Sequence, residues 1–159
     1  MADYSIEDKE EMIKANVARL NAHKSRLQEL IEFIKVSGFH KIGIANCLSM
    51  QKYADKLAEI LRENGFTVFS VNCKESGLDG CVICEEMKGP CCDPISQAEF
   101  LNDQKTEFNI NVGLCLGHGL LFQKYSRAPV TTFIVKDFAH EHNVAASLSV
   151  PLPASRSPP

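Results

Sequence analysis

The sequence has no tryptophan and no long apolar run. Aromatic residues make up 8% of the 159 residues, and the absence of Trp removes one common anchor for sugars and stacked bases. No apolar run approaches the roughly 20 residues that a helix needs to span a bilayer, so we expect no membrane partner. The polar, acidic segment 1–11 has no signal-peptide pattern, which predicts a cytoplasmic location.

The sequence also lacks an excess of positive charge. The chain has 17 Lys and Arg against 20 Asp and Glu, a net charge of -3 at pH 7. Without a basic field, nucleic acid is not an expected partner. The glycines form neither a dinucleotide-binding fingerprint nor a phosphate-binding P-loop. Hydrophobic residues make up 45% of the chain, enough to bury the core of one globular domain.

Helical and strand patterns alternate along the chain. Helical spacing predicts a helix or helix pair over 6–20 and 23–37, and further helices over 49–64, 95–104 and 117–126. Short apolar runs predict buried strands over 41–47, 67–73, 108–115 and 130–136. This order is typical of an α/β fold, here a three-layer Rossmann-like domain with a mostly parallel four-stranded sheet. We expect residues 1–150 to form this single domain and the Pro-rich segment 151–159 to form a disordered tail.

Seven cysteines are the most informative residues present. In a chain without a secretory signal, a disulfide framework is disfavoured, and this number of thiols favours metal, cluster or redox chemistry. Any one of them could instead be a small buried hydrophobe.

Three cysteines occupy equivalent positions, because Cys47, Cys73 and Cys115 end the first three predicted strands. Ligand sites in open parallel sheets lie at the carboxyl ends of the strands, which are about 4.8 Å apart. If the first strand lies between the other two, the three thiols meet at one edge. Thiolates prefer soft metals, so we predict zinc or an iron–sulfur cluster there.

Cys92 is the preferred fourth ligand, because it leads directly into the helix that Pro94 opens. Secondary candidates are the CxxC pair Cys81 and Cys84, the adjacent Cys91, and His118 in the turn after the third strand. Crowded thiols without a counter-charge repel one another when ionised, so some should have a raised pKa. Lys136, which ends the fourth strand, is interpreted as a solvated strand end.

Two other functions remain open. The first is a thiol-dependent enzyme of sulfur or redox chemistry, with Cys92 or Cys115 as nucleophile and His118 as base. Free backbone N–H groups in the segment 113–119, which holds three glycines, could bind a small anionic or sulfur-containing molecule. The second is an interaction module that uses the long N-terminal helix as its partner surface.

Several long motifs resemble one uncharacterised family. They are residues 41–47, 92–102, 112–118, 124–132, 135–137 and 142–143. The family is the domain of unknown function 1847, whose members are described as metal-binding proteins and are common in anaerobic microbes. The resemblance covers roughly residues 25–148 and implies a cysteine-rich metal-binding protein without an established reaction.

Overall fold

Strands and helices alternate in the computed structural model, which describes residues 3–19 and 24–149. The expected disordered tail at 151–159 lies outside the described residues. The helices are α1 (Ile6–Arg19), α2 (Arg26–Ser37), α3 (Gln51–Glu63), α4 (Pro94–Asp103) and α5 (Leu116–Tyr125). The strands are β1 (Lys41–Asn46), β2 (Thr67–Asn72), β3 (Phe108–Val112) and β4 (Val130–Ile134). Short 3-10 helices are η1 (Leu48–Met50), η2 (Gly80–Val82) and η3 (Val144–Ser149).

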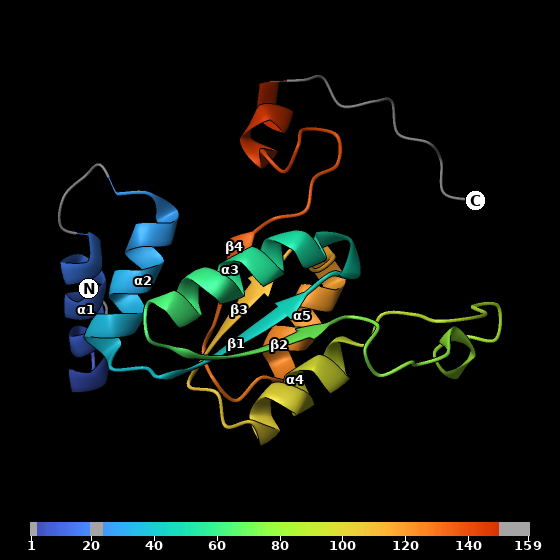
Figure 1. Cartoon of the computed structure of the whole chain (residues 1–159), viewed down its shortest axis with the longest axis horizontal. Helices are drawn as coiled ribbons and strands as arrows, with labels where there is room; N and C mark the ends of the chain where they lie inside the picture. The colour runs from blue at the N-terminus through green and yellow to red at the C-terminus, as the bar shows by residue number, and fades with distance from the viewer. Residues whose placement is uncertain (1–2, 20–23, 150–159) are drawn as a thin grey trace.

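All four strands are parallel and lie in the order β2-β1-β3-β4 (Figure 1). This confirms the α/β class and the parallel four-stranded sheet, and β1 lies between β2 and β3, which was the condition for the three cysteines to meet at one edge. Asn46, the last residue of β1, pairs with Asn72 of β2 and with Val112 of β3. The carboxyl ends of the three strands therefore lie level at one edge of the sheet.

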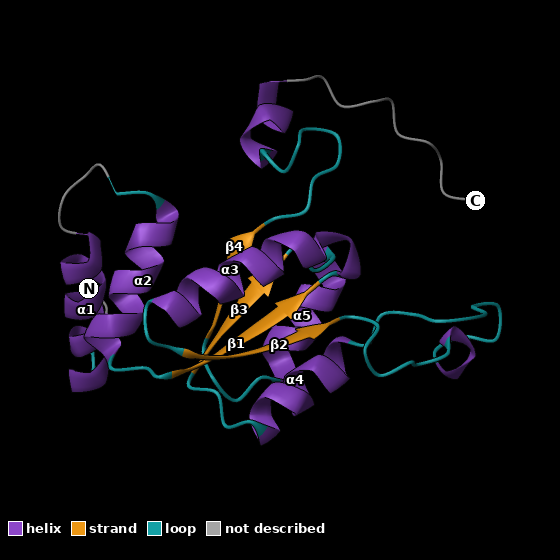
Figure 2. Ribbon diagram, in the orientation of Figure 1, coloured by secondary structure: helices purple, strands orange, loops and turns teal. Residues whose placement is uncertain are grey.

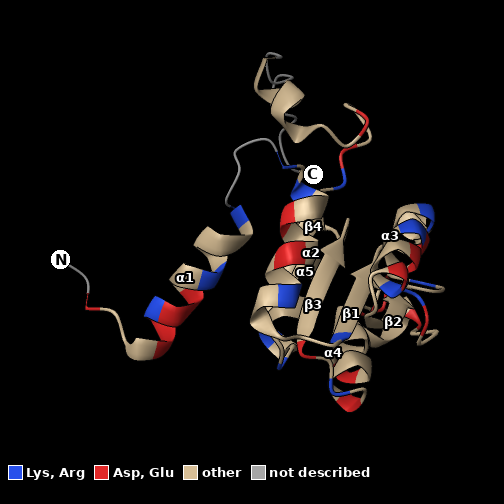
Figure 3. Cartoon of the chain, turned by 60° about the vertical axis from the view of Figure 1, so that its left-hand side comes forward, with Lys and Arg blue, Asp and Glu red and all other residues tan. Residues whose placement is uncertain are grey.

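Helices cover both faces of the sheet (Figure 2). On one face, α2 and α3 pack against the strands, and the rings of Phe33 and Phe108 lie 5.9 Å apart between centroids. On the other face, α4 and α5 pack together, and Leu101 of α4 approaches β1 so closely that a Cβ at Gly43 would lie 2.8 Å from it. The strands β3 and β4 carry no Asp, Glu, Lys or Arg (Figure 3).

The predicted N-terminal helix pair is present as α1 and α2. A capping box between Ser25 and Gln28 starts α2, and Gly38, with a φ of 71°, ends it. The helix α1 packs on α2 but leaves Ile6, Ile13 and other apolar side chains exposed. Among the described residues, no helix combines the length and apolar character needed to cross a membrane.

The strand ends differ from the prediction. Strands β1 and β2 each end one residue before their cysteine, and β3 ends at Val112, three residues before Cys115. Gly113 has a φ of 68°, which turns the chain out of the sheet, and the Asn111 side chain accepts the Leu114 N–H at 3.0 Å. Cys47 and Cys73 are thus the first residues after their strands and Cys115 is the third residue after β3, so none of the three lies within a strand.

Candidate functional site

Four cysteines lie around the carboxyl edge of the sheet. Cys47 and Cys73 directly follow β1 and β2, and Cys115 is the N-cap of α5. Cys92 precedes α4 and is tied to the end of β2, because the Asp93 N–H donates to the Cys73 carbonyl at 2.7 Å. The cause is topological, since parallel strands deliver the residues that follow them to one edge.

Two of these thiols are in direct contact. The Cys92 thiol donates to the Cys73 sulfur at an Sγ–Sγ distance of 3.4 Å. Cys73 is only 2% exposed, and this burial raises its pKa to about 12. The Leu48 N–H, 3.4 Å from the Cys73 sulfur, opposes the rise, while Cys92 and Cys47 add to it. Cys73 is therefore a neutral thiol near pH 7; its pKa is raised as predicted, but burial is the main cause and the neighbouring thiols are a smaller one.

Lys136 joins the other two thiols, so its interpretation as a solvated strand end is wrong. Its Nζ lies 3.2 Å from Cys47 Sγ and 3.1 Å from Cys115 Sγ. The two sulfurs are therefore separated by no more than these two distances together. Because β4 is parallel to the other strands, the residues after it reach the same edge. The position of Lys136 just after the fourth predicted strand was therefore the feature of the sequence that could have placed it beside the thiols.

The lysine supplies a counter-charge that the cysteine pattern alone does not reveal. Burial raises the pKa of Cys47, but contacts with Ser49, whose Oγ lies 3.1 Å from the sulfur, and with Lys136 outweigh burial and lower it. Burial lowers the pKa of Lys136, yet Cys115 and Cys47 outweigh this effect and raise it. The site thus combines a thiol that resists ionisation, Cys73, with one that ionises more readily, Cys47.

The loop after β4 holds Lys136 in place. The Asp137 carboxylate lies 3.0 Å from His140 Nδ1, and the Asp137 N–H donates to His142 Nδ1 at 3.1 Å. The His142 ring packs edge-on against Tyr53 of α3, with 5.5 Å between ring centroids. These contacts fold the chain back over the carboxyl edge directly after Lys136.

Gln97 of α4 fixes the sheet beneath the thiols. Its buried Nε2 donates to the carbonyl of Val71 at 2.8 Å and to that of Asn46 at 3.2 Å. The Asn46 side chain donates in turn to the Cys47 carbonyl at 3.0 Å. Sequence reasoning missed this arrangement, because a single amide on an apolar helix face carries no recognisable signal.

Two of the secondary cysteines, Cys81 and Cys84, lie apart from this group, whereas Cys91 directly precedes Cys92. Cys81 and Cys84 are exposed and Cys91 is half-buried on the loop between β2 and α4. A bridge between Asp79 and Pro90 folds this loop into a hairpin that projects away from the sheet, in green at the right of Figure 1. Within the described residues, no hydrogen bond joins a sulfur of these three to one of the other four.

Cavities flank the thiols on both sides. One of about 390 Å³ is lined by Cys92, Cys91 and His118, and another of about 260 Å³ by Cys115 and Lys136. His118 is half-buried and makes no hydrogen bond to a sulfur among the described contacts. The structure therefore places His118 beside the site without joining it to either predicted nucleophile.

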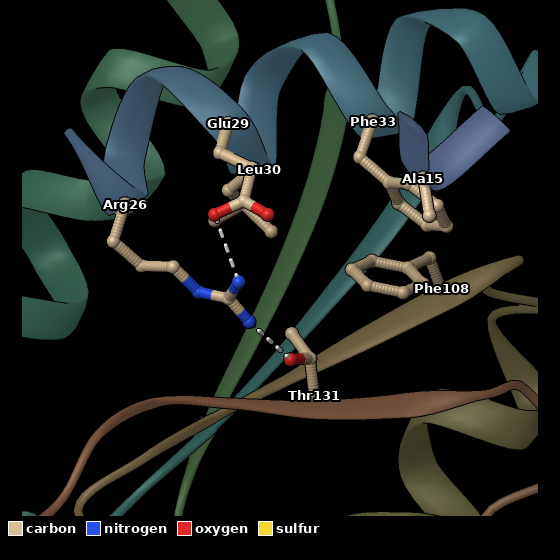
Figure 4. Close-up of a pocket in the computed structure, with 7 residues that line it drawn as sticks. All are labelled: Ala15, Arg26, Glu29, Leu30, Phe33, Phe108 and Thr131. Carbon is tan, nitrogen blue, oxygen red and sulfur yellow. Dashed lines mark hydrogen bonds and ion pairs between the residues drawn. The ribbon is translucent and has the colours of Figure 1, made fainter. Parts of the chain in front are cut away.

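A further cavity, of about 270 Å³, lies at the opposite edge of the sheet, between α1, α2 and the first residues of β3 and β4 (Figure 4). Its guanidinium, from Arg26, is already paired with Glu29 at 3.0 Å and lies 3.4 Å from the Thr131 hydroxyl. Phe33 and Phe108 form its inner wall. This cavity contains no thiol and is separate from the candidate site.

The four thiols form two contacts and not one preassembled ligand set. In the part of the chain that the structure describes, no group of three or more His, Cys, Asp or Glu residues is arranged to hold a metal ion. Two of the sulfurs contact each other, and the other two contact Lys136.

Comparison with known proteins identifies the family. Residues 1–133 match the family described as "Protein of unknown function (DUF1847)". The chain belongs to this family. An uncharacterised protein of Methanocaldococcus jannaschii is 50% identical to this DUF1847 chain over 130 residues, which cover 79% of the chain and 67% of the relative. No solved structure matches the chain.

The DUF1847 match includes Cys47, Cys73, Cys92 and Cys115. Lys136 and the loop that positions it lie beyond residue 133, where the match ends. The family is of unknown function, so the chemistry of the site has to be argued from its own geometry.

Proposed function

We propose that this DUF1847 protein binds a single thiophilic metal ion, zinc in the first place, through Cys47, Cys73, Cys92 and Cys115. The contact between Cys73 and Cys92 carries the proposal, because their sulfurs lie 3.4 Å apart. Around a tetrahedral zinc ion with Zn–S bonds of about 2.3 Å, neighbouring sulfurs lie about 3.8 Å apart. The pair is thus spaced nearly as two ligands of one ion are.

The spacing favours a single ion over a [4Fe–4S] cluster. In such a cluster each cysteine binds a different iron atom, so the ligand sulfurs lie farther apart than around one ion. In a [2Fe–2S] cluster two cysteines share each iron atom, and visible absorbance distinguishes that case from zinc. Magnesium and calcium prefer oxygen ligands and do not suit a group of thiols.

Electrostatics also supports a bound cation. The ammonium group of Lys136 is the cation that the described residues place beside the thiols Cys47 and Cys115. A divalent ion would supply a larger charge and would ionise even Cys73, whose pKa is otherwise about 12. On binding, we expect the ion to replace Lys136 as the partner of both sulfurs.

Metal analysis of anaerobically purified protein tests the proposal. We expect about one zinc ion per chain and no visible colour, whereas broad visible absorbance would indicate a cluster. Replacing zinc by Co²⁺ should give the intense bands of a tetrahedral thiolate site. Cys115→Ser should lower the metal content sharply, and Cys81→Ser, an exposed thiol on the hairpin, is the matched control that should not. Full metal content in Cys115→Ser, or no metal in the wild type, would contradict the proposal.

A second candidate function is nucleophilic chemistry at Cys115. Cys115 is exposed, its sulfur lies 3.1 Å from Lys136 Nζ, and a cavity of about 260 Å³ adjoins it. A cation beside an accessible thiol is the setting in which reactive cysteines occur. Limiting iodoacetamide should then label Cys115 before the exposed Cys81 and Cys84 in metal-free protein. Equal labelling of the three would argue against this function.

A further inference from the structure

The contact between Cys73 and Cys92 has a second chemical use. Among the hydrogen bonds of the described residues, this is the only one that joins two sulfur atoms, which lie 3.4 Å apart. Its backbone is held together independently, because the Asp93 N–H donates to the Cys73 carbonyl at 2.7 Å. A disulfide has an S–S bond of about 2.05 Å, so the sulfurs need to approach by only about 1.4 Å to form one.

We propose that Cys73 and Cys92 form a redox-active dithiol that reduces small disulfides and closes to an intramolecular disulfide. This activity goes beyond metal binding. It rests on the proposed function in one respect only, namely that closing the disulfide removes two of the four ligands of the metal.

Accessibility sets the order of the two thiols. Cys92 is half-buried and lines the cavity of about 390 Å³, whereas Cys73 is 2% exposed and lies behind it. A small disulfide can therefore reach Cys92 but not Cys73. The cavity is mainly apolar, with Lys74, Asp93 and His118 as polar groups at its wall. Its size suits a disulfide of amino-acid or short-peptide size and not the disulfide of a folded protein.

The reaction has two thiol–disulfide exchange steps. The Cys92 thiolate attacks one sulfur of the small disulfide RSSR, the S–S bond of RSSR breaks, and the first RS⁻ leaves. Cys73 gives its proton to the first RS⁻ as it leaves and attacks the Cys92 sulfur, and the second RS⁻ leaves and takes up the proton that Cys92 lost when its thiolate formed. The two cysteines lose two electrons and two protons in total, and RSSR becomes two RSH.

The consequence for a bound metal is direct. A disulfide sulfur is a poor ligand compared with a thiolate, so oxidation leaves only Cys47 and Cys115 to hold the ion. Both of these sulfurs already contact Lys136. When the metal leaves, the ammonium group of Lys136 compensates the negative charge of the remaining thiolates. Metal binding and disulfide closure should therefore exclude each other.

Peptide mapping tests the dithiol. The full chain is treated with chelator, freed of reductant, incubated with glutathione disulfide, alkylated and digested with trypsin. Cleavage after Arg62, Lys74, Lys88 and Lys105 separates Cys73 in peptide 63–74 from Cys81 and Cys84 in peptide 75–88, and from Cys91 and Cys92 in peptide 89–105. We expect the loss of two thiols per chain, a disulfide between peptides 63–74 and 89–105, and the release of two molecules of glutathione.

Neighbouring variants identify the partner. Cys92→Ser should abolish the link, and Cys91→Ser, one residue away in the same peptide, should keep it. Stable mixed disulfides with no link between the peptides, a link within 75–88 alone, or a link that survives Cys92→Ser would overturn the proposal.

The two proposals fail separately. Zinc content is measured on reduced protein and the disulfide on chelator-treated protein, so neither result depends on the other. Zinc-loaded protein should form the link several-fold more slowly. A link that forms readily in a protein that never binds metal would support the dithiol and contradict the metal site.

Discussion

Lys136 places one positive charge among four thiols, within 3.2 Å of two of them. It contacts an exposed thiol, Cys115, and a buried one, Cys47. Burial raises the pKa of Cys47, but contacts with Ser49 and then with the ammonium group of Lys136 outweigh burial and lower it. Burial lowers the pKa of Lys136, and the two thiols outweigh burial and raise it. At the scale of single residues, the protonation of the site therefore depends on a side chain that is not itself a cysteine.

Removing this charge should make Cys47 harder to ionise. In metal-free protein, we expect Lys136→Met to raise the pKa of Cys47 and to slow its alkylation several-fold near neutral pH. The pH profile of iodoacetamide labelling, read by mass spectrometry, measures the change. Lys124→Met, an exposed position on α5, is the control and should leave the profile in place. An unchanged profile in Lys136→Met would show that the contact with Cys47 is absent in solution.

Glu107 offers a test of pH dependence away from the thiols. Its carboxylate accepts the N–H groups of Lys41, at 2.8 Å, and His40, at 2.6 Å, and these bonds lower its pKa below the ordinary 4.5. A lowered pKa in the folded state means that the stabilisation is full above the unfolded-state pKa and is lost as the pH falls through the folded-state pKa.

Glu107→Gln should therefore be less stable than the wild type at pH 7, by less than about 1 kcal/mol because the side chain is exposed. The difference should shrink below pH 4.5, where the wild-type carboxylate becomes protonated. Urea unfolding at pH 7 and at a pH below 4.5 measures the difference in the free energy of unfolding between the two proteins. An equal difference at neutral and acidic pH would contradict the charge-based explanation.

At the scale of elements, α4 holds the carboxyl ends of β1 and β2 together through Gln97. Its amide bonds the carbonyls of Asn46 and Val71, one from each strand, where both are buried. Because Cys47 and Cys73 follow these strands directly, the amide helps to set how the two thiols lie.

Gln97→Ala should lower the free energy of unfolding by about 1–3 kcal/mol, since the buried carbonyls of Val71 and Asn46 lose their bonds to the Gln97 amide, and the Asn46 carbonyl keeps only the Cys73 N–H at 2.9 Å. It should also slow the closure of the disulfide between Cys73 and Cys92, because the end of β2 is held less firmly. Glu99→Ala, on the exposed side of the same helix, is the control. Chemical denaturation measures the first effect, and the rate of peptide linkage measures the second. Wild-type values for both would remove Gln97 from this role.

The elements were predictable to the extent that burial determines them. Apolar runs located the four strands, and the spacing of apolar residues located the helices, because both patterns follow directly from packing on a core. The ends of the strands were less predictable. The end of β3 depends on the left-handed conformation of Gly113 and on a bond from the Asn111 side chain, and neither appears in a hydrophobic pattern.

The candidate site was likewise predictable where it follows from the arrangement of strands and helices, and not where it depends on single side-chain contacts. The edge at which Cys47, Cys73 and Cys115 gather followed from parallel topology, and Cys92 from the start of a helix. Lys136 and Gln97 did not follow, because their importance lies in contacts with residues far away in the sequence. The binding of a metal by the four cysteines stays a prediction, as does the cytoplasmic location.

At the scale of the whole molecule, a ligand that binds only the folded chain stabilises it by mass action. An ion at 100 times its Kd adds about 2.7 kcal/mol, which is about 5–11 °C in Tm for a chain of this size. We expect zinc to raise the Tm of the reduced protein by such an amount and to leave a Cys73→Ser/Cys92→Ser double variant unchanged. Calorimetry with and without chelator measures both. Equal shifts in the two proteins would place the zinc elsewhere.

The bond between the Asp93 N–H and the Cys73 carbonyl joins the two ends of the hairpin loop, where the loop leaves β2 and where it reaches α4. Since β2 and α4 are fastened to each other where the loop leaves and where it comes back, the sheet does not depend on an unbroken chain between them. A protease cut at the exposed Lys88 should therefore give two fragments that stay associated and keep the fold. The same place would accept new chain ends in a circular permutant, or a longer insertion, without disturbing the thiol edge.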